Sequence, residues 1–203
     1  MTNVLVLSGS NHSFEESAEV IHRFLSMRSD MKAMLTDDKD ILNSPKMNTF
    51  DVCVFGSGFT RAVRQDDGTM RRVPELNKAQ EDGLFNFVSG GKGLVGIHGS
   101  GWWIGGRAVD LLGGHANCHP AGLAFTVNIE DFDHEITLDM DDFEVDDEIY
   151  IAAYDPAVRI LASAEWHDAP TRWPGSSRMA RAASSTPRLD TAPAPLANPP
   201  CRR

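Results

Sequence analysis

The chain has 203 residues, which favours one domain with a well-buried core, and its 41% hydrophobic and 24% charged residues are ordinary for a globular protein. Its net charge of −10 argues against a nucleic-acid-binding surface, because phosphate contacts need clustered Lys and Arg. Three scattered cysteines, Cys53, Cys118 and Cys201, exclude a disulfide framework and favour a reducing, cytoplasmic setting. We find no signal-peptide pattern and no apolar run long enough to span a bilayer, so we expect no membrane association.

Short apolar runs separated by glycine-rich turns organise the first half of the chain. Residues 4–7 and 94–97, and residues 51–55 after Asp51, have the continuous apolar character of buried parallel strands. Helical spacing of apolar residues, together with capping signals, predicts helices over 13–25 and 74–88. The alternation of strand and helix predicts an α/β domain, a parallel-sheet three-layer sandwich with helices on both faces.

The segments around and after these elements are more polar. Residues 60–73 predict a loop, and further strands are expected at 123–129 and 158–162. The acidic stretch 139–148 lacks the calcium-loop pattern, so a solvated face is expected there. The basic residues of the predicted loop are expected to be solvent-exposed, with contact to an anionic substrate or to a second subunit of a homo-oligomer as the alternative: Arg61, Arg64, Arg71 and Arg72.

The composition changes at Ala169. Residues 169–203 hold seven of the 11 prolines and too few apolar side chains to form a core. We therefore divide the chain into a folded domain, residues 1–168, and a low-complexity tail, residues 169–203. The tail is either naturally disordered or the product of a frameshift, because a permitted back-translation of 169–190, read two bases along, gives two strand-like runs joined by glycine-rich turns. A stop codon in that shifted frame would exclude the frameshift.

Ligands bind beyond the carboxyl ends of parallel strands, so the loops that follow the three predicted strands should meet at one crevice. His98 lies there at a strand-to-helix turn, which would expose its imidazole as a general base or metal ligand; the alternative is a structural histidine bonded to backbone. His12 follows the first strand at the same edge, with helix capping as its alternative. Ser10 and Gly99, in these loops, are candidate substrate-binding residues.

Aromatic and histidine residues supply further candidates. Trp102 and Trp103 are adjacent, so one can stack on a sugar ring while the other packs in the core, or both can pack. His115 and His119 are four residues apart, and a helix would bring them to one divalent metal, although the neighbouring glycines and proline oppose a long helix. His134 is predicted to lie in a loop bordering the pocket.

Six segments are weak patterns individually, but their order and spacing together are specific: 4–7 with His12, 50–55, 87–98, 113–120, 130–137 and 143–150. Over residues 3–167 this order resembles the trehalose-utilisation (ThuA-like) family of the class I glutamine amidotransferase-like superfamily. The resemblance implies that superfamily's fold and a role in bacterial disaccharide utilisation. It also implies that Glu148 and Tyr150, which match the family's Glu-x-Tyr pattern, reach the pocket. His98 stands where amidotransferases carry a nucleophilic cysteine, and an imidazole cannot replace that thiolate, so glutaminase activity is not expected.

Three functions follow from these observations. The first is an enzyme or accessory protein that binds a small sugar or sugar derivative; an enzyme of this kind would modify or hydrolyse sugars. The second is a flavodoxin-like FMN reductase, because residues 7–10 resemble a flavin phosphate loop, although a second flavin loop is not evident. The third is a non-catalytic ligand-binding module. The sequence assigns no cofactor beyond the candidate divalent metal.

Overall fold

A computed structural model describes residues 1–10, 17–102, 111–119 and 123–164. The chain divides into two compact units, Met1–Leu112 and Gly113–Arg203. The tail predicted from residue 169, with its frameshift explanation, lies outside the described residues. Within the described ranges, no helix combines the length and apolar character that a bilayer crossing requires.

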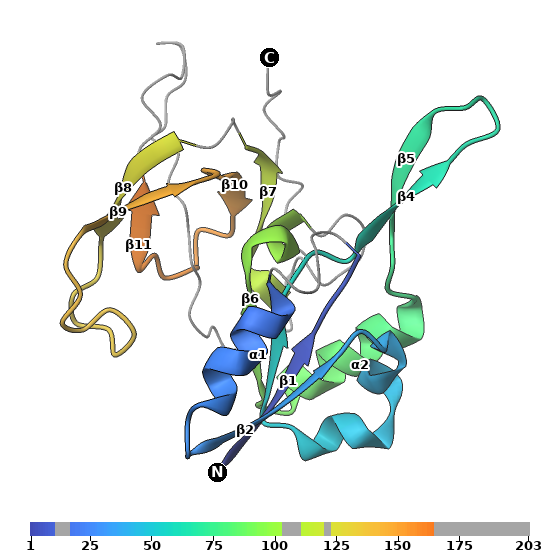
Figure 1. The fold of residues 1–203 in the computed structure, drawn as a ribbon, viewed down its shortest axis with the longest axis horizontal. Helices are drawn as coiled ribbons and strands as arrows, with labels where there is room; N and C mark the ends of the chain where they lie inside the picture. The colour runs from blue at the N-terminus through green and yellow to red at the C-terminus, as the bar shows by residue number, and fades with distance from the viewer. Residues whose placement is uncertain (11–16, 103–110, 120–122, 165–203) are drawn as a thin grey trace. The chain divides into compact units, whose positions relative to one another are not determined.

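The first unit is built on a four-stranded parallel sheet in the order β2-β1-β3-β6 (Figure 1). Its strands are β1 (Thr2–Leu7), β2 (Met31–Thr36), β3 (Val52–Phe55) and β6 (Gly93–Gly96). Leu7 pairs with Phe55, and Phe55 with Gly96, so three strands end on one row. The predicted parallel sheet is confirmed, and β2 is an additional edge strand.

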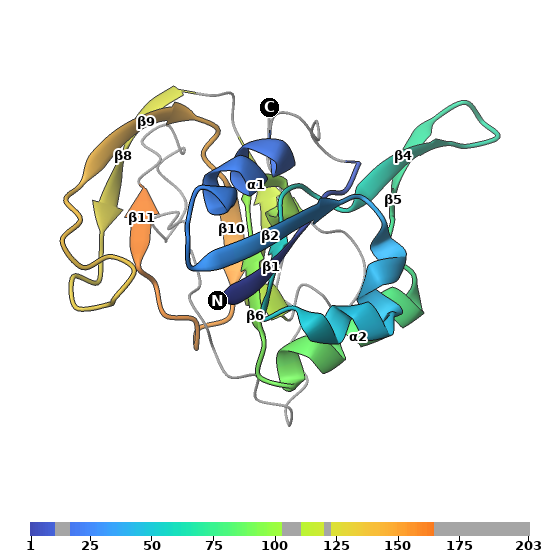
Figure 2. The ribbon, with the colours of Figure 1, turned by 60° about the horizontal axis from the view of Figure 1, so that its bottom comes forward.

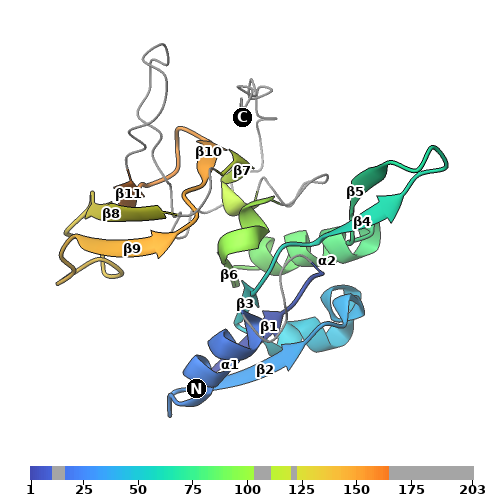
Figure 3. The same ribbon diagram turned by 45° about the horizontal axis from the view of Figure 1, so that its top comes forward.

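Helical segments cover both faces of this sheet (Figures 1 and 3). Helix α1 (Ala18–Ser26) lies on one face, and α2 (Lys78–Ser89) lies on the other with the 3₁₀ turns η1 (Lys39–Asn43) and η2 (Pro45–Thr49). Side chains alternate along a strand, so β1 contributes to both cores. Val4 and Val6 pack with Ala18, whereas Leu5 and Leu7 pack with residues of α2 and the 3₁₀ turns.

Cys53 belongs to the core on the α2 side. Its side chain is fully buried, and burial raises the pKa of its thiol. A protonated, inaccessible thiol is a packing group rather than a nucleophile.

Helix α2 begins at Lys78, so the predicted start at Pro74 was too early. Asn77 accepts a hydrogen bond from the Gln80 amide at 3.0 Å, and the Gln80 side chain accepts one from the Asn77 amide at 2.9 Å. This reciprocal capping box satisfies free amides of the first turn. Pro74 instead ends a strand, and Glu75 follows it in a bend.

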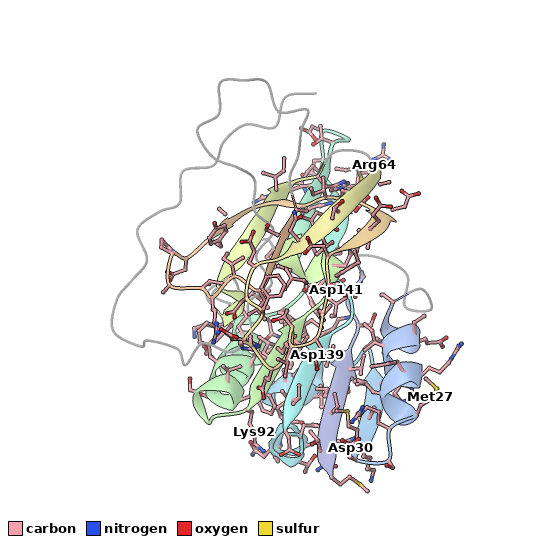
Figure 4. All side chains as sticks on the ribbon, turned by 90° about the vertical axis from the view of Figure 1, so that its left-hand side faces the viewer. Met27, Asp30, Arg64, Lys92, Asp139 and Asp141 are labelled. Carbon is pink, nitrogen blue, oxygen red and sulfur yellow. The ribbon has the colours of Figure 1, made fainter. Side chains whose placement is uncertain are left out.

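The segment predicted as a loop over 60–73 is an antiparallel hairpin. Its strands are β4 (Thr60–Arg64) and β5 (Met70–Pro74), with Gly68 at φ 84° in the turn. Figure 4 shows Arg64 at the opposite end of this unit from Asp30 and Lys92, which precede β2 and β6. The hairpin therefore extends from the edge of the sheet where the strands end, and the side chains of its four arginines are exposed.

The second unit contains antiparallel strands. One sheet pairs β7 (Gly114–Cys118) with β10 (Ile151–Tyr154), and another has the order β11-β8-β9 (Figure 2). The latter comprises β8 (Leu123–Ile129), β9 (Phe143–Asp147) and β11 (Ala162–Ala164). The strand expected at 123–129 is confirmed, and that expected at 158–162 lies slightly later. The acidic stretch, whose Asp139 and Asp141 are labelled in Figure 4, continues into β9, and its aspartates are exposed, which confirms the expected solvated face.

Asp51 ties together the amino ends of β1 and β6, and this gives a testable acid dependence. Its carboxylate accepts hydrogen bonds from the Lys92 ammonium at 2.8 Å and the Asn3 amide at 2.9 Å. These bonds, led by that from Lys92, hold the pKa of Asp51 below its ordinary value of 3.8. The ionised carboxylate therefore stabilises the fold above that value, and the contribution is lost as the pH falls through the lower folded-state pKa.

We expect Asp51→Asn to lower the urea midpoint at pH 7 and to weaken the loss of stability between about pH 5 and pH 3, on either side of the ordinary pKa of 3.8. Urea titrations across this range would measure both effects. Asp37→Asn, at an exposed position in the same unit, is the control. The same acid dependence in both variants would contradict the role given to Asp51.

Candidate functional site

The turns after β1, β3 and β6 begin at the same level of the sheet. Gly9, Ser57 and His98 each lie two residues beyond the last paired positions of these neighbouring strands. The ladder continues one residue past the strands, because the Gly56 amide donates to the Leu7 carbonyl and the Ile97 amide to the Phe55 carbonyl, each at 3.0 Å. The strand register therefore places the backbone of Ser57 and of His98 at the same level of the carboxyl edge.

His98 occupies a sharp bend between β6 and the 3₁₀ turn η3 (His98–Trp102). Its φ of 45° is left-handed, which is uncommon for any residue other than glycine. A Cβ on Gly96 would lie 2.7 Å from Ser100 Oγ, so the bend needs small residues two positions before and after His98. Strand-to-helix elbows that present a catalytic side chain have this same arrangement. The turn expected at His98 is therefore present, and its functional role stays a prediction.

The turns after β1 and β3 are bonded to each other through Ser57. Its Oγ accepts a hydrogen bond from the Gly9 amide at 2.6 Å and donates to the Gly9 carbonyl at 3.2 Å. Ser8 Oγ lies 3.4 Å from Ser57 Oγ, and both serines are buried. A Cβ on Gly9 would lie 2.1 Å from the Gly58 carbonyl oxygen. The two turns thus meet backbone to backbone.

Glu75 is a further residue at this edge, which we did not predict from the sequence. Its side chain is only 6% exposed, and its Oε2 accepts a hydrogen bond from the Ser10 amide at 3.0 Å and lies 4.0 Å from Lys39 Nζ. The hairpin positions it, since the Glu75 amide donates to the Phe59 carbonyl at 3.0 Å. The neighbouring Pro74 led us to predict a helix start here. For this reason the burial of the Glu75 carboxylate beside the β1 turn was not predicted.

The carboxyl edge therefore carries an imidazole and a buried carboxylate, beside two buried serine hydroxyls that are bonded within the turns. The carboxylate accepts hydrogen bonds and a neutral imidazole both donates and accepts them, as the hydroxyl groups of a sugar require. A hollow of about 340 Å³ lies elsewhere in this unit, between the 3₁₀ turns and α2. Its lining includes Leu42, Met47, Gly83 and Phe87 and no titratable side chain. The hollow therefore lacks an acid or a base, whereas the carboxyl edge has both His98 and Glu75. The carboxyl edge is the candidate site.

Three predicted residues of the second unit lie together: His119, Glu148 and Tyr150. His119 Nδ1 is 3.5 Å from Glu148 Oε1, and Tyr150 Oη donates to Glu148 Oε2 at 3.3 Å. The rings of His119 and Tyr150 pack edge to face with centroids 5.5 Å apart. Burial raises the pKa of Tyr150, with the Glu148 charge as a further cause, so the phenol keeps its proton at neutral pH. The Glu148 carboxylate thus accepts a hydrogen bond from the Tyr150 phenol and lies close to the His119 imidazole.

Other predicted residues have different surroundings. His134 orders the loop after β8, because its Nδ1 accepts a hydrogen bond from the Ile136 amide at 3.1 Å. His115 lies in β7, so its four-residue separation from His119 corresponds to roughly 13 Å along a strand instead of one helical turn. Helical geometry therefore gives no support to the proposed metal pair. Among the described residues, no group of three or more His, Cys, Asp or Glu side chains is placed to hold a metal ion.

The remaining residues predicted from the sequence follow β1 and β6. Gly99 is buried inside η3, and Trp102 is the last residue of that turn. Ser10 is exposed, with its amide bonded to Glu75. His12 and Trp103 lie outside the described residues.

The fold is similar to that of solved proteins from three bacteria. A protein described as ThuA-like from Bacteroides uniformis has a TM-score of 0.63 at 16% identity, covering 81% of this chain and 68% of that one. One so described from Parabacteroides merdae has 0.58 at 13%, covering 80% and 68%. A cytoplasmic protein from Salmonella typhimurium has 0.54 at 14%, covering 80% and 79%. At such identities the likeness establishes the fold alone.

Sequence comparison gives the family itself. No curated protein matches the chain. The family model for ThuA, trehalose utilisation, matches residues 3–185. This range includes every described strand except the first residue of β1. It also extends past residue 168, where the sequence predicted the end of the folded domain. The chain belongs to the ThuA (trehalose utilisation) family.

Proposed function

We propose that the protein binds a sugar-like small molecule at the carboxyl edge of its parallel sheet, with His98 central, as part of bacterial disaccharide utilisation of the trehalose type. We further propose that its fold is of the class I glutamine amidotransferase-like kind, with His98 in place of the cysteine. The observation that carries the proposal is the left-handed bend at His98, on the same row as Ser57.

A strained backbone position persists only where the surrounding structure holds it. Here Gly96 and Ser100 allow the close approach that keeps His98 at the bend. A neutral imidazole has one donor and one acceptor nitrogen, so it can bind a sugar hydroxyl or take its proton near neutral pH. Glu75 and Lys39 extend the polar surface toward Ser10.

The FMN-reductase alternative has less support from this geometry. A flavin phosphate loop needs free backbone amides. Here the Gly9 amide donates to Ser57 and the Ser10 amide donates to the Glu75 carboxylate. A negative charge beside the loop would also repel a phosphate. The non-catalytic ligand-binding module remains the alternative, and turnover measurements separate it from an enzyme.

We expect His98→Ala to weaken disaccharide binding roughly tenfold or more, the loss of about one buried hydrogen bond. Isothermal titration calorimetry with trehalose, sucrose, maltose and their keto derivatives would measure this, and chromatography of the same mixtures would detect turnover. His22→Ala, in α1, is the matched control, since the His22 ring contacts Ser26 within its own helix.

Binding that is equal in wild type and His98→Ala would remove His98 from the site. A purified protein that binds none of these sugars but carries a yellow chromophore would favour the FMN-reductase alternative instead. Binding that depends on His98 without any turnover would favour the ligand-binding module.

A further inference from the structure

We propose that the arginine-bearing hairpin β4–β5 docks on the acidic edge strand β9 of a second copy of this chain. The contact joins the first unit of one copy to the second unit of another. It does not depend on the proposed function, because neither surface includes His98 or requires a sugar ligand.

The hairpin carries positive charge that no described residue of the chain neutralises. Arg61 pairs with Val73, and Arg71 lies two residues before Val73, so the two arginines are diagonal neighbours on one face. Both side chains are exposed, and neither is in an ion pair with a described residue. Like charges at neighbouring positions of one face repel each other. An anionic partner on this face would therefore stabilise the hairpin.

The position of the hairpin leaves this charge accessible. Among the described strands, β4 and β5 pair only with each other, and they extend from the carboxyl edge of the parallel sheet (Figure 1). The acidic residues of the hairpin, Asp66 and Asp67, lie in the turn, where Asp67 accepts hydrogen bonds from Thr69. The strands themselves are thus basic, in a chain whose 29 acidic residues outnumber its 19 basic ones.

Strand β9 offers the opposite charge at an open edge. Its sheet has the order β11-β8-β9, so β8 is its single neighbour within the described part of the chain. Glu144 and Asp146 are two residues apart in β9, which places their side chains on one face. Both are exposed, and neither is in an ion pair with a described residue. An open strand edge also presents backbone groups that can bond to another strand.

Charge determines which of these edges can meet between copies. Two hairpins would bring arginine against arginine, and two β9 edges would bring carboxylate against carboxylate. Only the contact of a hairpin with β9 brings opposite charges together, which favours encounter and selects the partner. Paired edges place the side chains of one face next to each other, so the two arginines meet the two carboxylates. A second copy therefore supplies both the complementary charge and the matching edge.

The contact is heterologous, because different surfaces of the two copies meet. A copy that has lost its basic hairpin can still supply β9, and a copy that has lost its acidic edge can still supply the hairpin. Mixing two such variants therefore tests the contact directly.

Sedimentation equilibrium of the full chain tests the association itself. We expect a mass above that of a single chain at about 0.05 M salt. The dissociation constant should rise roughly tenfold or more at about 0.5 M salt, because salt screens exposed ion pairs. A protein that is monomeric at low salt, or an assembly that salt does not weaken, would overturn the proposal.

Charge reversal identifies the two surfaces. The hairpin variant carries Arg61→Glu with Arg71→Glu, and the strand variant carries Glu144→Lys with Asp146→Lys. Each variant alone should be monomeric at low salt, because each sets like charges against each other. An equimolar mixture should associate, since the strand variant keeps its hairpin and the hairpin variant keeps its β9 edge. A protein with all four changes should also associate, because its charges are exchanged.

The matched control is Arg23→Glu with Lys46→Glu, which changes the net charge as much as the hairpin variant does, at exposed positions outside both surfaces. We expect it to associate like the wild type, and circular dichroism would verify that every variant is folded. Loss of association in the control would indicate a general effect of net charge. A mixture that stays monomeric would show that the hairpin does not meet β9. Either result would overturn the proposal.

Discussion

Replacing Phe59 with alanine is expected to lower the free energy of unfolding by about 3–5 kcal/mol, the usual cost of removing a buried phenyl ring. Phe59 is completely buried, and its ring centroid lies 4.6 Å from that of Phe55, also completely buried. The substitution would leave a cavity directly behind the turn that carries Ser57. Urea denaturation at neutral pH, followed by circular dichroism, would measure the loss.

The matched control is Phe24→Ala, the same change on α1 at a side chain that is 61% exposed. Its expected cost is within about 0.5 kcal/mol, as for most surface substitutions. Similar losses in both variants would show that Phe59 does not pack as described. A loss confined to Phe59→Ala would confirm that the Phe59 ring is packed in the core.

Gly9→Ala is expected to destabilise the fold by about 1–3 kcal/mol or more and to abolish ligand binding at the carboxyl edge. The new Cβ would lie 2.1 Å from the Gly58 carbonyl oxygen and 3.1 Å from Glu75 Oε2. Because the nearest atom belongs to the backbone, the β1 and β3 turns would have to separate. That movement would break the hydrogen bonds between Gly9 and Ser57.

Urea denaturation and sugar titration calorimetry on the same preparation would measure both effects. Gly93→Ala is the control at the opposite end of the sheet, where the new Cβ would meet a Val52 side-chain methyl group at 3.2 Å instead of backbone. We expect it to cost less than Gly9→Ala and to leave binding intact. A Gly9→Ala protein with wild-type stability would contradict the close approach of the two turns.

The sequence predicted those elements whose signal is local and continuous. Strands β1, β3 and β6 come from apolar runs, because a strand buried on both faces needs no polar alternation. Strand β2 was missed because it is an edge strand, only half-buried and interrupted by the exposed Lys32. The hairpin β4–β5 was missed because its arginines dominate the composition and its burial does not alternate, since Val63 and Val73 are single half-buried residues among exposed ones.

The candidate site was predictable to the extent that topology alone defines it. His98 follows a buried strand, so its position at the carboxyl edge required no knowledge of packing. Glu75 was missed because its burial depends on the hairpin. Glu148 and Tyr150 were implied by the family pattern, whereas His119 was considered as a metal ligand on a helix. Their association depends on the pairing of β7 with β10, whose residues are far apart in the sequence.

The bonds from Ser57 to Gly9 and from Ser10 to Glu75 have a consequence for selectivity. Turns cross-linked in this way have little conformational entropy left to lose when a ligand arrives. They also cannot re-aim their polar atoms to suit a different stereochemistry. A sugar epimer with one inverted hydroxyl would leave a desolvated partner unsatisfied, so such a surface would distinguish diastereomers by rigidity.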